Sequence, residues 1–285
     1  MANMRAIEPL EVGLLFWATE NAEESLQNLR RFGVSAGQLG VSGELSLAGK
    51  AEQWQQALGA QPEVAILTAV CSFQGEDYAD IPTVTRTVGL VPRVTRAERL
   101  ARTKAVADFT SAIGIASVAC HVGVVPPSHE TQAYGEVRDL TRELCDYCAD
   151  RGQTFALETG QESAEHLLAF IEDVDRPNLK VNFDPANMIL YGTGNPIEAL
   201  EQLRHKVIST HCKDGDGPDP AQPDALGHER TLGQGSVGIP AFVEKLRQIG
   251  YTGMLSVERE EPNLEVRAVD IATGIQLLRQ LTGRS

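Results

Sequence analysis

The chain has 285 residues, of which 42% are hydrophobic and 22% are charged, so its length fits two small domains or one large α/β barrel. No run of about 18 apolar residues occurs, which argues against a membrane span, and the N-terminal stretch lacks a signal-peptide core, so we expect a cytoplasmic protein. The formal net charge of −14 repels phosphate backbones and argues against a nucleic-acid partner.

Short apolar, β-rich runs alternate with helical patterns along the chain. The runs predict strands over residues 12–17, 36–41, 63–73, 116–122, 153–158, 179–184, 206–212 and 253–258. The helical patterns cover residues 21–33, 49–59, 95–113, 131–151, 162–173, 196–204, 239–249 and 263–282. Thr95, with Glu98 three residues on, has the spacing of a capping box. Long loops are expected over 74–94 and 214–231.

This alternation predicts the fold. Strands so apolar, each separated from the next by a helix, are typical of a parallel sheet covered by helices. Eight strand–helix units in a chain of this length predict a single (β/α)8 TIM barrel. Because no linker of the kind that joins two domains is visible, residues 1–285 are expected to form one domain.

The five cysteines are scattered and odd in number. Cys120 and Cys212 fall in apolar strand runs, where small buried thiols are expected. Cys145 and Cys148 form a C-x-x-C motif, but it lies inside a helical pattern and has no second pair elsewhere in the sequence. Two packing thiols are therefore favoured over a zinc or redox site.

The predicted strand ends carry ionisable side chains, and the active site of a (β/α)8 barrel forms at the carboxyl ends of its strands. Five consecutive strands end in such residues: His121, Glu158, Asp184, His211 and Glu258. A single acidic residue at a strand end is most often a solvent-exposed charge, and a single histidine there is most often a hydrogen-bonded core residue. Ionisable residues at several consecutive strand ends instead indicate a common site. Three carboxylates and one imidazole suit a single divalent ion such as Mn, Mg, Co or Zn. Without an ion the carboxylates repel one another.

Five segments are the most distinctive in the chain: Leu157-Glu158-Thr159, Asn182-Phe183-Asp184-Pro185-Ala186-Asn187, His211-Cys212-Lys213-Asp214, Leu232-Gly233-Gln234-Gly235 and Ser256-Val257-Glu258. In these segments, and over nearly its whole length, the chain resembles the xylose isomerase-like (β/α)8 barrels, which include sugar and sugar-phosphate isomerases and epimerases. The resemblance implies that one divalent metal ion is bound by Glu158, Asp184, His211 and Glu258.

The same resemblance implies a metal-dependent isomerase or epimerase that acts on a small keto- or aldo-sugar or a polyol. The metal polarises a carbonyl, a glutamate removes the proton alpha to it, and the metal-stabilised enediolate is then reprotonated. Glu158 and Glu258 are the expected proton carriers as well as ligands. No phosphate cradle is visible, so an unphosphorylated substrate is expected. The family leads us to expect a homodimer or homotetramer.

Further residues are candidates for substrate contact: Trp17, His121, Asn187, Lys213, His228 and Arg230. Lys213 follows a predicted ligand, and a surface salt bridge is its alternative role. Trp17 ends the first strand, where it forms either a wall for sugar stacking or part of the core. The loops over 74–94 and 214–231 are long enough to act as lids.

Three alternatives remain open. Similar barrels dehydrate keto-polyols through the same kind of intermediate, so a metal-dependent dehydratase is the main alternative. An abasic-site DNA endonuclease of the same superfamily holds three zinc ions and has a histidine three residues after the sixth-strand aspartate, where this chain has Asn187. A metal-free binding barrel that has lost its activity is the third, and the complete ligand set argues against it.

The stretch from Gly233 to Gly238 matches G-x-G-x-x-G, with Glu258 twenty residues further on. A dinucleotide site needs an apolar strand that runs straight into the first glycine, whereas residues 224–231 are a polar loop. We therefore expect no nucleotide cofactor and interpret the glycines as a tight passage from a loop into the next helix.

Overall fold

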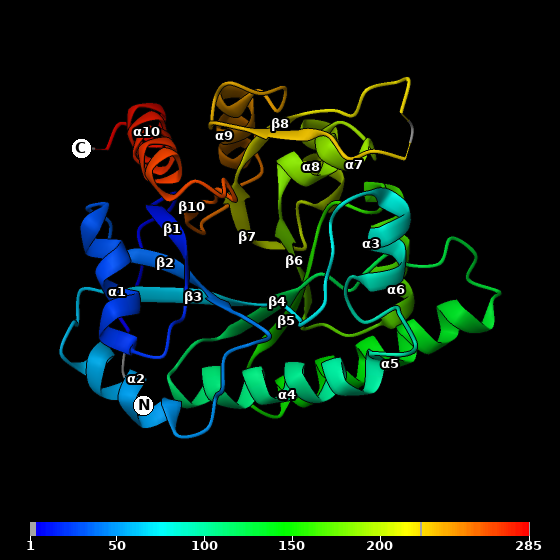
Figure 1. The fold of residues 1–285 in the computed structure, drawn as a ribbon, viewed down its shortest axis with the longest axis horizontal. Helices are drawn as coiled ribbons and strands as arrows, with labels where there is room; N and C mark the ends of the chain where they lie inside the picture. The colour runs from blue at the N-terminus through cyan, green and yellow to red at the C-terminus, as the bar shows by residue number, and fades with distance from the viewer. Residues whose placement is uncertain (1–3, 223, 285) are drawn as a thin grey trace.

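A closed barrel of parallel strands forms the centre of the molecule (Figure 1). The computed structural model describes residues 4–222 and 224–284. Around the barrel the strands follow the order β1-β10-β7-β6-β5-β4-β3-β2, which confirms the prediction of a single (β/α)8 barrel. Their bounds are β1 Val12–Trp17, β2 Ala36–Val41, β3 Ala65–Cys71, β4 Ser117–Cys120, β5 Thr154–Glu158, β6 Leu179–Phe183, β7 Val207–Cys212 and β10 Leu255–Val257.

Helices surround the barrel, and at least one helix separates each barrel strand from the next barrel strand in the chain (Figure 1). Within the described ranges, none of these helices has the length and apolarity to cross a membrane. Their bounds are α1 Ala22–Arg31, α2 Lys50–Gly59, α3 Ile81–Thr87, α4 Arg96–Ala112, α5 Gln132–Ala149, α6 Ala164–Val174, α7 Pro185–Tyr191, α8 Pro196–Leu203, α9 Ile239–Gln248 and α10 Leu264–Thr282.

Local sequence explains where these elements lie. All six positions of β2 are buried, because one face of the strand lies in the barrel and the other lies under helices, and the strand is accordingly apolar except for Gln38. Helix α5 begins where the side chain of Thr131 accepts a hydrogen bond from the backbone N–H of Tyr134. Its buried residues include Val137, Leu140 and Leu144, whose spacing of three and four residues places them on one face.

Two segments expected to be loops contain short elements. Helix α3 lies within residues 74–94, and an antiparallel hairpin of β8 (Asp214–Asp216) and β9 (His228–Arg230) lies within 214–231. The two segments meet at the mouth of the barrel, where the backbone N–H of Ile81 donates to the carbonyl oxygen of Asp224 (2.9 Å). Within the described residues, both segments contain regular elements that the sequence does not predict.

The prediction of a capping box at Thr95 is wrong. Thr95 precedes α4, but its side chain makes no capping hydrogen bond and its backbone is already helical, with φ −102° and ψ −7°. An N-cap side chain reaches the helix N–H groups from an extended backbone, which explains why the spacing alone does not create the cap.

All five cysteines are buried free thiols. Cys145 and Cys148 pack within the inner face of α5, and burial raises the pKa of each thiol to about 12. A thiol held protonated in this way is a poor metal ligand and a poor nucleophile. This environment agrees with the expected packing role of the C-x-x-C motif.

Candidate metal centre and active site

The predicted ligands meet at the carboxyl end of the barrel, in what we call the barrel-end group: Glu158, Asp184, His211 and Glu258. Asn182 on β6 hydrogen-bonds to Gln38 on β2 (3.1 Å), and because β6 and β2 are not neighbours, both side chains point to the barrel axis. Side chains alternate along a strand, so Asp184, two residues after Asn182, returns to the same inward side.

His211 is close to all three carboxylates of the barrel-end group. Its Nδ1 lies 2.8 Å from Glu258 Oε2, 3.2 Å from Glu158 Oε1 and 3.6 Å from Asp184 Oδ2. One potential ligand atom from each residue lies within 4.8 Å of the other three, and all four residues are buried. This spread is compatible with a single central ion, because two opposite metal–ligand bonds of ~2.1 Å span about 4 Å.

The unpaired atoms of this group fit a divalent cation. Asp184 Oδ2, His211 Nδ1 and Glu258 Oε2 are buried and lie close to one another, but none of the three atoms makes a hydrogen bond. A buried polar atom left unpaired costs ~1–3 kcal/mol, and a charged one costs more. A cation among these atoms would satisfy all three, and three carboxylates with one imidazole are suitable ligands for Mn²⁺, Mg²⁺, Co²⁺ or Zn²⁺.

Charges inside the group shift the pKa values of its members. Burial raises the pKa of Glu158, but the positive charges of His121 and His211 outweigh burial and bring that pKa down to about 2. Burial lowers the pKa of His211, yet the carboxylates of Glu258 and Glu158 raise it well above its ordinary value. A proton and a metal ion compete for the same lone pair on His211 Nδ1, so metal uptake releases protons.

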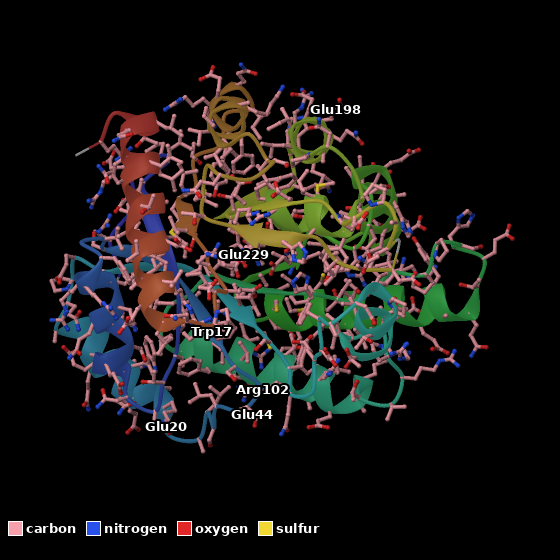
Figure 2. All side chains as sticks on the ribbon, turned by 45° about the horizontal axis from the view of Figure 1, so that its top comes forward. Trp17, Glu20, Glu44, Arg102, Glu198 and Glu229 are labelled. Carbon is pink, nitrogen blue, oxygen red and sulfur yellow. The ribbon has the colours of Figure 1, made fainter. Side chains whose placement is uncertain are left out.

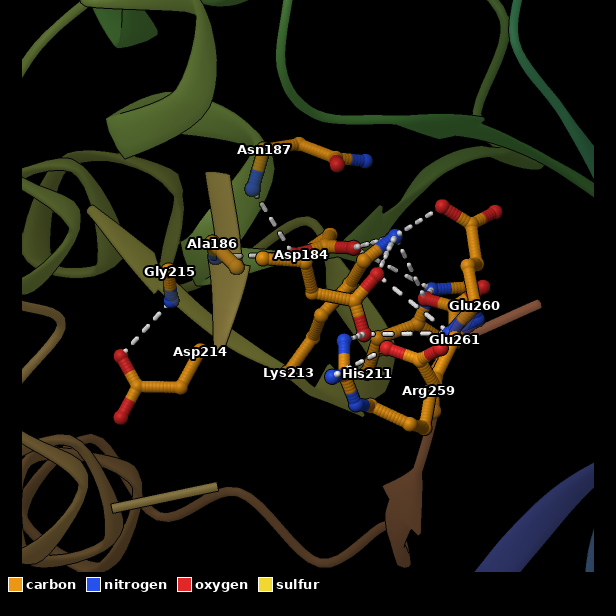
Figure 3. A network of polar contacts seen from close by, with 12 residues as sticks. Asp184, Ala186, Asn187, His211, Lys213, Asp214, Gly215, Arg259, Glu260 and Glu261 are labelled. Atoms are coloured by element: carbon orange, nitrogen blue, oxygen red, sulfur yellow. Dashed lines mark hydrogen bonds and ion pairs between the residues drawn. The ribbon is translucent and has the colours of Figure 1, made fainter. Parts of the chain in front are cut away.

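The turn after β6 fixes the carboxylate of Asp184. Its Oδ1 accepts hydrogen bonds from the backbone N–H groups of Ala186 (2.8 Å) and Asn187 (3.0 Å), which makes Asp184 the N-cap of α7 (Figure 3). Pro185 occupies the first helical position, where its missing N–H costs nothing. With Oδ1 held by the helix, Oδ2 faces His211.

A cavity of about 600 Å³ adjoins the barrel-end group. Five of the six expected substrate contacts line it: Trp17, His121, Asn187, Lys213 and His228. Trp17 is 41% exposed at the end of β1, so it is a wall of the cavity and not a core aromatic. Tyr78 and Tyr191 add further aromatic surface to the lining.

Two of these lining residues hold Glu158 from the cavity side. Asn187 Nδ2 donates to Glu158 Oε1 (3.2 Å), and His121 Nε2 lies 3.4 Å from the same oxygen. The other nitrogen of His121, Nδ1, lies 3.2 Å from Gln161 Nε2. The position of the Glu158 carboxylate is thus set by α7 and by the end of β4.

Lys213 belongs to the site and not to the surface. Its side chain is only 4% exposed, and its Nζ lies 3.0 Å from Glu260 Oε2 and 3.6 Å from Glu258 Oε2 (Figure 3). Burial lowers the pKa of Lys213, but the surrounding carboxylates, led by Glu258 and Glu260, raise it well above its ordinary value. Lys213 therefore carries a positive charge into the cavity, which corrects the alternative of a surface salt bridge.

Arg230 is placed differently from the other candidates. It pairs with Asp216 across the hairpin (Nε to Oδ2, 2.7 Å), its side chain is 52% exposed, and it does not appear in the described lining of the cavity. A substrate contact for Arg230 is therefore not supported.

The sequence did not point to three acidic residues of the cavity mouth: Glu76, Glu229 and Glu260. Glu229 on β9 forms an ion pair with Arg259 (Nη1 to Oε1, 2.9 Å) and accepts a hydrogen bond from the backbone N–H of Glu260 (3.1 Å). Glu229 and Trp17, both labelled in Figure 2, line the same cavity, although they come from β9 and β1. The position of Glu260, two residues after the predicted ligand Glu258, could have indicated a place near the site. Glu229 lies in a polar loop, where no sequence pattern indicates such a place.

The glycine-rich stretch wraps the carboxylate of Asp214. The backbone N–H of Gly215 donates to Oδ1 (2.9 Å) (Figure 3). The N–H of Val237 donates to the same oxygen (3.1 Å), and those of Gly233 and Gly235 donate to Oδ2 (2.9 and 3.0 Å). A Cβ on Gly235 would lie 2.4 Å from Asp214 Oδ1, so this position requires glycine. The N–H groups that a dinucleotide site would offer to phosphates are here directed at an internal carboxylate.

These features define a class of protein, a (β/α)8 barrel with an acidic–histidine centre at the carboxyl ends of its strands. The family model described as xylose isomerase-like TIM barrel matches residues 20–281, and the chain belongs to this family.

Several solved structures are similar to the chain. A xylose isomerase domain protein from Planctomyces limnophilus is 40% identical, with 96% of this chain and 97% of that chain covered and a TM-score of 0.90. A D-psicose 3-epimerase, solved in the presence of D-fructose, is 14% identical over 96% and 100% of the two chains, with a TM-score of 0.68. The probable 3-DHS dehydratase of Bacillus anthracis is 17% identical over 94% and 98%, with a TM-score of 0.67.

One curated relative matches more narrowly. An uncharacterised protein of Methanocaldococcus jannaschii is 30% identical over 110 residues, which span 38% of this chain and 34% of the relative. The matched region thus covers about a third of the relative's length. The family and its structural neighbours, which include sugar epimerases and a dehydratase, make an enzyme the expected kind of protein.

Proposed function

We propose that the protein is a divalent-metal-dependent isomerase or epimerase of a small, unphosphorylated keto- or aldo-sugar or polyol. The observation that carries this proposal is the pair of carboxylates Glu158 and Glu258, which line one cavity and lie 3.2 and 2.8 Å from His211 Nδ1. They come from β5 and β10, which flank β6 and β7 in the barrel, so a substrate between them meets a carboxylate on each side.

The residues of this chain supply the proton transfers. Moving a proton at a carbon next to a carbonyl needs one base that removes it and a second group that returns it. The low pKa of Glu158 keeps its carboxylate ionised, and Asn187 and His121 hold it in place. A low pKa also makes a carboxylate a weak base, so removal of the alpha proton would depend on a bound ion that polarises the carbonyl. Glu258 is the group that returns a proton from the other side, and Lys213 donates a hydrogen bond to a substrate oxygen.

The barrel-end group would hold the ion through Glu158, Asp184, His211 and Glu258. A bound divalent ion supplies Lewis-acid polarisation of the substrate carbonyl. The excess of carboxylate ligands favours the harder ions, and we propose Mn²⁺ as the first to test, with Mg²⁺, Co²⁺ and Zn²⁺ as alternatives. We propose no nucleotide cofactor.

The charge of the cavity supports an unphosphorylated substrate. Glu76, Glu229 and Glu260 stand at its mouth, whereas the lining found within the described residues includes no arginine. A phosphate group would meet this acidic rim before it reached Lys213, and like charges repel. The aromatic wall of Trp17 and Tyr78 offers a neutral sugar an apolar face to stack against.

A metal-dependent dehydratase of a keto-polyol is the second candidate, and the position of Lys213 favours it. Loss of water needs an acid that protonates the departing hydroxyl, in addition to the base that removes the alpha proton. Lys213 Nζ is inside the cavity and 3.6 Å from Glu258 Oε2, where it is able to reach such a hydroxyl.

One experiment separates these candidates. The Mn²⁺-loaded protein is incubated with a panel of neutral ketoses in deuterated water, and products are read by mass spectrometry and NMR. An isomerase or epimerase places deuterium in an isomeric sugar, whereas a dehydratase yields a product that has lost water.

The variants supply the controls for this experiment. Glu158→Gln should abolish both outcomes, because the amide is nearly isosteric but not basic. Glu165→Gln, on the exposed side of α6, should change neither outcome. A protein that takes up neither Mn²⁺ nor Co²⁺ would refute the proposal and favour an inactive binding barrel.

We further propose that this enzyme works in the cytoplasm as a homodimer or homotetramer, without a nucleic-acid or membrane partner. The five buried free thiols suit a reducing compartment, and the net charge of −14 disfavours DNA. Light scattering of the purified protein measures the assembly, and a gel shift with abasic-site DNA tests the endonuclease alternative.

A further inference from the structure

His211 is contacted on its second ring nitrogen by a buried chain of polar side chains. His211 Nε2 lies 3.1 Å from Asn182 Nδ2. Asn182 Oδ1 accepts hydrogen bonds from Ser209 Oγ (2.6 Å) and from Gln38 Nε2 (3.1 Å). Gln38, Asn182 and Ser209, which we call the polar chain, come from β2, β6 and β7 and are buried inside the barrel.

We propose that the polar chain positions His211 as a metal ligand, with Asn182 accepting the Nε2–H so that Nδ1 presents its lone pair to the ion. This inference rests on the proposed metal site. A neutral imidazole carries one N–H and one lone pair, so coordination through Nδ1 requires the proton on Nε2. Histidine ligands almost always donate that second N–H to an oxygen, which fixes the ring and strengthens the ligand.

The amide of Asn182 is able to meet this requirement. In the structure its nitrogen faces His211 Nε2. When the amide turns over, Oδ1 takes that place and accepts the Nε2–H, while Nδ2 faces Ser209 and Gln38. If the Gln38 amide turns as well, both hydrogen bonds persist with donor and acceptor exchanged, and the Ser209 hydroxyl serves in either role.

A purely structural role does not require an amide at this position. Asn182 is fully buried, and a hydrocarbon side chain of similar volume would fill the space without the cost of removing polar atoms from water. Asn182 lies on β6, two residues before the predicted ligand Asp184. The strand that carries Asp184 therefore also carries the side chain that contacts His211. Gln38 reaches Asn182 from across the barrel and limits its movement.

The first test uses the unmodified protein. Proton–nitrogen correlation NMR of the Zn²⁺-loaded protein, assigned with the His211→Gln variant, reports which ring nitrogen carries hydrogen. The proposal expects hydrogen on Nε2 and coordination by Nδ1. Coordination by Nε2, or an Nε2 without hydrogen, would overturn it.

The second test measures Mn²⁺ affinity by electron paramagnetic resonance titration. Asn182→Leu removes the acceptor and should weaken binding by ~10–100-fold, whereas Asn182→Asp keeps an acceptor oxygen and should stay within about tenfold of wild type. Gln153→Leu is the matched control. Gln153 is a buried amide that donates to Thr110 Oγ1 and to the Ile115 carbonyl oxygen (2.9 Å each), before the start of β5, so its loss should reduce thermal stability and leave Mn²⁺ affinity unchanged.

The outcomes distinguish this inference from the proposed function. A wild-type protein that binds no metal overturns both. A wild-type protein that binds Mn²⁺, together with an Asn182→Leu variant that binds it equally well, overturns only the role of the polar chain. If Asn182→Leu does not fold, Ser209→Ala replaces it: the loss of the 2.6 Å hydrogen bond to Asn182 should weaken Mn²⁺ binding several-fold, and unchanged binding overturns the proposal.

Discussion

Replacement of Asp214 by alanine should destabilise the loop that leads from the β8–β9 hairpin into α9. Asp214 is 1% exposed, and its carboxylate accepts four backbone hydrogen bonds of 2.9–3.1 Å. Alanine removes the acceptor for all four N–H groups at once. It also removes the carboxylate around which Gly233 and Gly235 are folded.

The size of the effect follows from which donors are buried. The hydrogen bonds from Gly215 and Val237 are buried, so their N–H groups become unpaired, whereas those from Gly233 and Gly235 are partly buried and water replaces Asp214 there. An unpaired buried donor costs ~1–3 kcal/mol, and two such donors lower the free energy of unfolding by about 2–6 kcal/mol.

Urea unfolding of wild type and Asp214→Ala measures this difference, and hydrogen exchange locates it. Exchange of the Gly233 and Gly235 amides should rise strongly in the variant. Asp216→Asn, a partly exposed change on the same hairpin that loses the ion pair with Arg230, should shift the free energy of unfolding by no more than ~1 kcal/mol. A loss below about 1 kcal/mol, with unaltered exchange at both glycines, would refute the reasoning.

Burial raises the pKa of Glu162 from its ordinary value of 4.5 to about 7. Between these two pH values the native state holds a proton that the unfolded chain releases, so the free energy of unfolding falls as pH rises from 4.5 to about 7. Glu162→Gln should abolish that fall. The difference in free energy of unfolding between variant and wild type, measured in urea, should therefore be roughly 3 kcal/mol more favourable to the variant at pH 8 than at pH 4, and parallel pH profiles of the two proteins would contradict this. Trp54→Ala, at a fully buried ring 6.1 Å from Phe109, should cost ~3–5 kcal/mol in the same assay, and a loss under about 1 kcal/mol would be inconsistent with the packing. Lys213→Met should lower kcat/KM at least about tenfold while Arg230→Ala leaves it unchanged, and equal effects of the two would show that the cavity is not the substrate site.

The barrel strands were predictable because parallel strands buried on both faces are mostly apolar. Residues 12–17 and 36–41 coincide with β1 and β2, and the other expected strands overlap the observed ones with small differences at their ends. The carboxyl ends of all the barrel strands meet at one mouth, and every second side chain there points to the barrel axis, which is why Asp184 and Glu258 could be assigned to a common site from the sequence.

The remaining elements depend on contacts that sequence periodicity does not report. Helix α3 and the β8–β9 hairpin are short, and each is held by neighbours at the barrel mouth. Helix α7 had a local signal that was overlooked, because Asp184 followed by Pro185 is the pattern of an N-cap and first helical residue. Glu229 comes to the cavity through Arg259, a tertiary pair that no spacing in the sequence predicts.

Two segments that line the cavity are separate from those that carry the barrel-end group. Tyr78 precedes α3 and His228 lies on β9, and these two segments meet through the hydrogen bond between Ile81 and Asp224. Insertions or substitutions there reshape the opening without disturbing strand pairing. Directed evolution toward other substrates should therefore concentrate its mutational libraries on residues 76–88 and 224–229, and leave the strand ends that carry the barrel-end group intact.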